Sequence, residues 1–118
     1  MKRKHKITFV ILSIILLAIV LTPVIYVQAN KIIYAHRVTQ YLLGEKKYTK
    51  DEIEEVRGVW GIKLPPFYAV VKFKDEPDVE YIYFAHNSVF QFAYKITEEG
   101  LKKQLTEKQL KHFDPKNW

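Results

Sequence analysis

The chain is 118 residues long, contains no cysteine and carries a formal net charge of +6 at pH 7. This length allows one domain, and the lack of cysteine excludes disulfides, thiolate metal sites and a cysteine nucleophile. From Asn30 onward, 15 basic residues face 13 acidic ones, a net charge of +2, so the basic excess is not a nucleic-acid-binding surface and we expect no nucleic-acid partner.

The segment from Ile7 to Val27 holds 21 residues without a charge. As a helix, at about 1.5 Å per residue, it spans roughly 30 Å, the thickness of the hydrocarbon core of a bilayer. The sequence therefore predicts a transmembrane anchor over residues 7–27, with the lipid bilayer as its partner. Four basic residues lie in segment 1–6, and such residues favour the cytoplasmic side. We expect a single-pass protein of the cell membrane, with segment 1–6 in the cytoplasm and an extracytoplasmic domain over residues 30–118.

A cleaved signal peptide is the alternative interpretation of the same segment. Val27-Gln28-Ala29 offers small or compact residues where a signal peptidase cuts, and cleavage after Ala29 would give a secreted domain. The apolar stretch 24–26 favours the retained anchor, because a cleavage region is usually more polar. A buried core helix is disfavoured, because a chain of 118 residues cannot surround such a long uncharged run.

Residues 30–44 show the spacing of a helix with one apolar face, and Gly44 provides a stop. This helix either continues the membrane segment or begins anew with Asn30 as its N-cap. The pattern Thr49–Glu52 is a capping box, which predicts a short helical turn.

Four segments then alternate apolar and polar residues, which is typical of strands: residues 56–64, 67–74, 79–85 and 89–95. Pro65-Pro66 ends the first segment, and we expect turns at residues 75–78 and 86–88. From Thr97 a thin apolar stripe predicts a helix that Pro115 ends. The predicted fold class is α+β: an N-terminal transmembrane helix, one helix packed on an antiparallel meander of about four strands, and a C-terminal helix.

The run from Tyr68 to Tyr83, YAVVKFKDEPDVEYIY, resembles domain-of-unknown-function family 3139, small membrane-associated proteins of Gram-positive bacteria. The resemblance covers most of the chain: a basic start, an apolar segment, a helix, and a strand ending in Asp-Glu-Pro-Asp before a tyrosine-rich strand. It implies a membrane-associated protein with a small α+β domain. It brings no assigned catalytic residues.

The aromatic residues of the last two strands are the candidate interaction surface, although core packing is the favoured interpretation for them: Tyr81, Tyr83, Phe84, Phe90, Phe92 and Tyr94. The acidic cluster Asp75, Glu76, Asp78 and Glu80 lacks the spacing and the glycine of a calcium loop, so a turn of solvated acids explains it better. His86 and Ser88 have no nucleophile elbow around them, so turn chemistry accounts for both.

We therefore expect no catalytic, cofactor-binding or metal-binding residue and no enzymatic activity. The leading hypothesis is a membrane-anchored module that binds an envelope protein or a peptide through its sheet or a sheet edge. The alternative is an immunity or inhibitor-type protein of the envelope, and a small hydrolase is a third, less favoured possibility.

Overall fold

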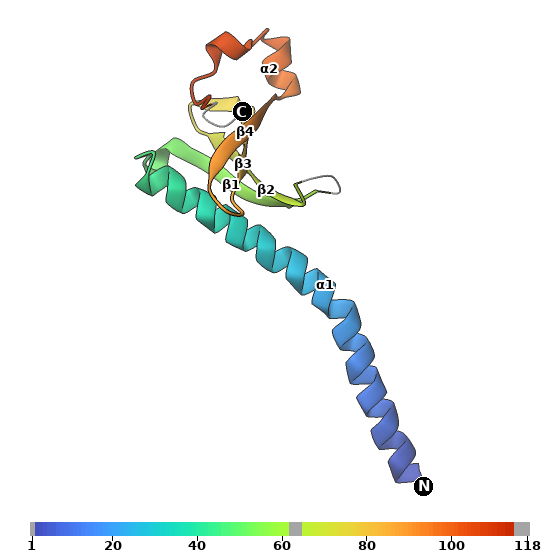
Figure 1. Ribbon diagram of the computed structural model, residues 1–118. Helices are drawn as coiled ribbons and strands as arrows, with labels where there is room; N and C mark the ends of the chain where they lie inside the picture. The colour runs from blue at the N-terminus through green and yellow to red at the C-terminus, as the bar shows by residue number, and fades with distance from the viewer. Residues whose placement is uncertain (1, 62–64, 115–118) are drawn as a thin grey trace.

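The computed structural model describes residues 2–61 and 65–114, which form one long helix, a four-stranded sheet and a short C-terminal segment (Figure 1). The helix α1 spans Lys2–Gly44. The strands are β1 (Ile53–Trp60), β2 (Phe67–Phe73), β3 (Glu76–Phe84) and β4 (Phe90–Ile96). The helix α2 spans Glu98–Lys102, and 3-10 turns occupy Lys50–Glu52 and Glu107–Gln109. This arrangement confirms the predicted α+β class.

Helix α1 is continuous from the apolar run into the domain, so the first of the two alternatives for residues 30–44 is correct. Asn30 is not a cap, because its side-chain amide donates to the carbonyl of Tyr26 one turn earlier. Pro23 lies inside the helix, which changes direction about midway along its length (Figure 1). Every described side chain from Arg3 to Tyr26 is exposed, and within this stretch the ring of Tyr26 contacts Phe67 of β2.

The four strands form one antiparallel sheet in the order β1-β2-β3-β4, which confirms the predicted meander. β1 begins at Ile53, three residues before the alternation in the sequence, because the capping box at Thr49 closes only a single 3-10 turn. Ile53 then pairs with Phe73 at the far end of β2. The expected continuation of this strand over residues 62–64 lies outside the described residues.

The turn expected at residues 75–78 is shorter than predicted. The chain reverses at Lys74-Asp75, and β3 already begins at Glu76, opposite Phe73. Pro77 is tolerated within β3 because the ladder between β2 and β3 shifts register there, so its missing N–H costs no regular ladder bond. Strand β3 begins early because Glu76 is buried and hydrogen-bonded, as described below.

The predicted C-terminal helix is present and begins after Thr97, but it is much shorter than expected. Thr97 caps α2 by accepting a hydrogen bond from the N–H of Gly100, as a helix start requires, but α2 ends after five residues. Gln104 has a φ of 61°, which no right-handed helix can contain. The chain beyond it runs as an irregular C-terminal segment, residues 105–114, which includes the 3-10 turn at Glu107–Gln109 and packs its apolar side chains on the sheet.

The core lies on one face of the sheet, called here the inner face. Alternate residues of β2 and β3 point to it and are buried, as is Ala85 directly after β3: Phe67, Ala69, Val71, Phe73, Val79, Tyr81 and Tyr83. The second half of α1 covers part of this face with Tyr34, Val38 and Leu42. The C-terminal segment adds Leu105, Leu110 and Phe113.

Helix α1 and strand β1 touch backbone to backbone where they cross. Gly58 lies against Lys31, and a Cβ atom at Gly58 would overlap the carbonyl group of Lys31. A glycine is therefore required at this position for steric reasons, and the crossing fixes where the helix lies on the sheet.

Candidate functional site

The outer face of the sheet is the first candidate surface, because α1 and the C-terminal segment both pack on the inner face. Half-buried outer-face residues at one end of the sheet form an apolar outer patch around Val70, which is itself only 7% exposed: Val59, Tyr68, Ile82, Phe84, Phe90 and Ala93. At its edge the rings of Phe84 and Phe90 lie opposite each other, with centroids 5.3 Å apart. An apolar sheet face of this kind is typical of a protein-binding surface.

Charged side chains occupy the other end of the outer face. Arg57 pairs with Glu55 at 2.9 Å and with Glu80 at 3.5 Å. Lys72 and Lys95 lie in the neighbouring strands, opposite Glu55 and Glu80. The face therefore combines an apolar patch with charges of both signs, which suits a polypeptide better than a polyanion.

The six aromatic residues of the predicted interaction surface lie in different parts of the structure. Tyr81 and Tyr83, with 0% and 2% of their surface exposed, belong to the core. Tyr94 contacts Phe113 of the C-terminal segment, and Phe92 is half-buried beside the register shift in β4. Phe84 and Phe90 remain on the outer face. The shift to Gln91 as the inward-facing residue could not be predicted, because a bulge breaks the alternation of β4.

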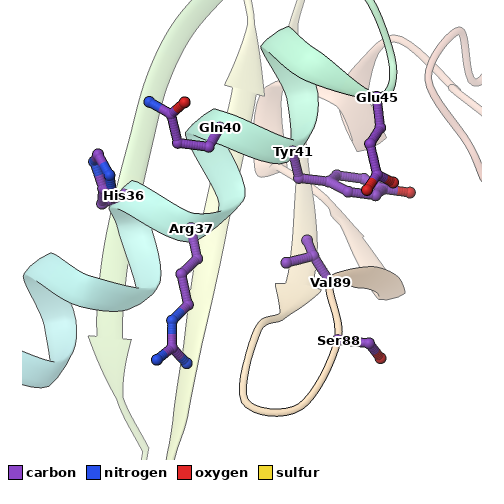
Figure 2. A pocket seen from close by; sticks show the side chains of 7 residues that line it. All are labelled: His36, Arg37, Gln40, Tyr41, Glu45, Ser88 and Val89. Atoms are coloured by element: carbon purple, nitrogen blue, oxygen red, sulfur yellow. The ribbon is translucent and has the colours of Figure 1, made fainter.

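An open cleft of about 590 Å³ lies between α1 and the loop that joins β3 to β4. Figure 2 shows the residues that line it, which come from α1 and from the loop: His36, Arg37, Gln40, Tyr41, Glu45, Ser88 and Val89. Arg37 Nη1 donates to the carbonyl oxygens of Ala85 and His86, at 2.9 and 3.2 Å, and so holds the loop against the helix. The cleft thus has fixed walls and a polar rim. The sequence explained Ser88 by a turn alone and did not indicate the helix residues opposite it, which lie about 50 positions away.

A buried carboxylate lies where the sequence suggested only solvated acids. Glu76 keeps 7% of its surface exposed and accepts hydrogen bonds from the Tyr81 hydroxyl and, at 2.8 Å, from the backbone N–H of Lys111. Burial, and then the hydrogen bond to Glu76, raises the pKa of the Tyr81 phenol. This network ties the C-terminal segment to β3.

Three side chains form a second tie, called here the C-terminal latch: Tyr48, Asp75 and His112. His112 Nε2 lies 2.7 Å from Asp75 Oδ1, and its Nδ1 lies 2.9 Å from the Tyr48 hydroxyl. The imidazole also stacks on Phe73, with centroids 3.8 Å apart. An acid, a histidine and a hydroxyl in a row can relay a proton. In the latch, however, both ring nitrogens of His112 are hydrogen-bonded and the ring is almost buried. The arrangement therefore holds the C-terminal segment in place.

The latch makes the stability of the domain depend on pH in the acid range. The hydrogen bond with His112 lowers the pKa of the Asp75 carboxyl below its usual value. Its contribution is present above the unfolded-state pKa of about 4 and is lost as the pH falls through the lower folded-state value. We expect Asp75→Asn to reduce the unfolding free energy at pH 7 and to flatten its decline below pH of about 4, measured by urea unfolding. The same change at exposed Asp51 should leave that decline unchanged.

The other candidate residues are not brought together. The acids of the cluster point to different partners: Asp78 lies 2.8 Å from Lys103, and Glu80 pairs with Arg57. His86 Nδ1 lies 3.2 Å from the Tyr34 hydroxyl. Within residues 2–61 and 65–114, no group of three or more histidine, aspartate or glutamate side chains is placed to hold a metal ion.

Comparison with known proteins gives one family. The model of the family described as "Protein of unknown function (DUF3139)" matches residues 4–83. The match covers α1, β1, β2 and β3 almost to its end, whereas β4 and the C-terminal segment lie beyond it. Neither a curated protein nor a solved structure matches the chain.

Proposed function

The chain belongs to the DUF3139 family of proteins of unknown function, and on this premise we propose that it is a membrane-anchored, extracytoplasmic module that binds a polypeptide partner. The single observation that carries the proposal is the asymmetry of the sheet. Its inner face is covered by α1 and the C-terminal segment, whereas its outer face presents an apolar patch at the end of a membrane-length helix. The partner is a polypeptide that offers apolar side chains to this patch.

The exposure of α1 supports the anchor. The helix is long and apolar enough to cross a bilayer, and none of its most apolar 18-residue window is buried in the protein. Water would solvate that surface at a cost of about 25 cal/mol per Å² of apolar area, whereas a bilayer removes the cost. The basic residues Arg3, Lys4 and Lys6 precede the run and favour a cytoplasmic N-terminus, which places the sheet outside.

Packing at the end of the apolar run supports retention of the segment over cleavage after Ala29. Val27 is half-buried against the core, and the ring of Tyr26 contacts Phe67 with centroids 5.9 Å apart. Cleavage would remove both contacts and would cut inside a continuous helix. Signal peptidases act on more extended and polar regions, so these contacts favour a retained anchor.

The proposed activity is binding, not catalysis. Among the described residues, neither His86 nor Ser88 has an acid–base partner set beside it, and the histidine of the latch is closed to a substrate. The immunity or inhibitor-type role is a special case of binding to one protein, and no observation here favours it over other partners. A hydrolase is not proposed.

Site-specific photo-crosslinking in native membranes tests the proposal. A photoreactive phenylalanine analogue at Phe84 or Phe90 is expected to give one discrete adduct. The same analogue at Leu101, which is 62% exposed on α2, is expected to give none. Adding Phe84→Glu to the chain that carries the probe at Phe90 should lower the adduct about thirtyfold, because loss of an aromatic anchor costs on the order of 2 kcal/mol of binding.

Two controls keep the result interpretable. Thermal unfolding of the Phe84→Glu chain should match that of the parent, since Phe84 is on the outer face. The intact mass of the membrane-bound chain should show that residues 7–27 are retained. Equal crosslinking from positions 84 and 101 would contradict the binding surface, and a chain that starts at Asn30 would contradict the anchor.

A further inference from the structure

The end of β1 carries an exposed aromatic side chain that the outer patch and the cleft do not use. Trp60 keeps 53% of its surface exposed. Among the described residues outside α1, Trp60 and Leu101 are the exposed large apolar side chains. A tryptophan buries more apolar area than any other residue type when it finds a partner, so such exposure calls for a specific explanation.

The position of Trp60 beside α1 explains its exposure. Trp60 points to the inner face, and together with one side of the helix it lines a shallow groove of about 320 Å³ whose helix residues are Pro23, Val24, Val27, Gln28 and Lys31. This stretch of helix is about 12 Å long at 1.5 Å per residue. It contains both the last apolar residue of the run, Val27, and the first charge after it, Lys31.

The boundary between an uncharged run and the first charge is where a membrane-spanning helix leaves the hydrocarbon core. Tyr26 lies at the same level, is exposed, and contacts Phe67 at the start of β2. Tryptophan and tyrosine are the residues that prefer this depth, because the ring enters the acyl boundary while the N–H or O–H remains among polar headgroups.

We propose that Trp60 is a second membrane contact of this protein. Its indole lies in the outer headgroup region of a phospholipid bilayer, beside Tyr26, so that this end of the sheet rests on the membrane surface. The partner is the lipid, because the groove is continuous with the apolar surface of α1 that the lipid covers. The inference rests on the proposed anchor over residues 7–27, and it is independent of the polypeptide partner.

Tryptophan fluorescence in protein-free phospholipid vesicles tests this contact. The chain contains two tryptophans, Trp60 and Trp118, so the full-length Trp118→Phe variant reports on Trp60 alone. Its emission is expected to be blue-shifted, strongly quenched by lipids brominated near the top of their acyl chains, and poorly quenched by aqueous acrylamide.

A matched variant moves the tryptophan to the opposite end of the domain. Figure 1 shows α2 at the far side of the sheet from the N-terminal half of α1. The chain with Trp60→Phe, Trp118→Phe and Leu101→Trp should emit further to the red, with at least twofold less bromolipid quenching and at least twofold more acrylamide quenching than Trp60.

Carbonate extraction of the same vesicles separates the inference from the anchor. If the chain resists extraction but Trp60 behaves like the tryptophan at position 101, the anchor stands and the Trp60 contact is overturned. If carbonate releases the chain, both are overturned. Bromolipid quenching of Trp60 in a resistant chain supports both, and because the vesicles contain no other protein, it identifies lipid as the occupant.

Discussion

Gly58→Ala is expected to destabilise the domain by about 3 kcal/mol, at the upper end of the cost of overpacking. The added methyl group meets the backbone of Lys31, not the tip of a flexible side chain, so neither a rotamer change nor a small side-chain shift can relieve the overlap. The helix and the strand must separate, which opens the packing of Tyr34 and Val27 on the sheet. Urea unfolding of the full chain in detergent micelles, followed by near-ultraviolet circular dichroism, measures the change.

Gly44→Ala is the matched control for this change. A Cβ at Gly44 meets no atom within 4 Å, and the position lies at the end of the same helix. Alanine favours the helix over glycine by up to about 1 kcal/mol, so this variant should be as stable as the parent or slightly more stable. An equal unfolding midpoint for Gly58→Ala and the parent would contradict the close crossing of α1 and β1.

Glu76→Ala is expected to destabilise the domain by about 3 kcal/mol, because it leaves the buried hydroxyl of Tyr81 and the N–H of Lys111 without their acceptor. Glu76→Gln keeps one acceptor oxygen but turns its NH2 toward the other donor, so it should cost about 2 kcal/mol, less than the alanine change. Urea unfolding measures both changes, and faster proteolysis of the C-terminal segment in Glu76→Ala should accompany the loss.

A double-mutant cycle with Tyr81→Phe distinguishes the hydrogen bond from simple packing. If the two side chains act through their hydrogen bond, Glu76→Ala should cost less in the Tyr81→Phe background than in the parent, because the orphaned hydroxyl is gone. Strictly additive losses would show that Glu76 stabilises β3 without Tyr81.

The regular parts of the fold were predictable because they follow local rules. Alternation in β2 and β3 separated the side chains of the two sheet faces, and short turns implied an antiparallel meander. The acidic residues in 75–78 were expected to be solvated, and for Glu76 this is wrong because its hydrogen-bonding partners lie 5 and 35 positions away in the sequence. No local pattern encodes such pairs.

The candidate site was predictable only in part for the same reason. Of the predicted surface residues, Phe84 and Phe90 lie on the outer face, whereas Tyr81 and Tyr83 are buried on the inner face by the elements that cover it. The cleft of Figure 2 and the C-terminal latch each join segments separated by 37 to 64 positions. Their chemistry arises from tertiary packing, which a single sequence does not display.

Because α1 is continuous, the number of residues between its apolar run and the sheet determines how these two parts are placed relative to each other. Each residue of a helix adds about 1.5 Å of height and 100° of rotation. Helix α1 is unbroken between Val27 and Tyr34. The number of residues between the apolar run and the sheet therefore sets both the distance of the apolar outer patch from that run and the direction in which the patch faces. If the proposed anchor spans a membrane, a tilt of the span becomes an equal tilt of the patch.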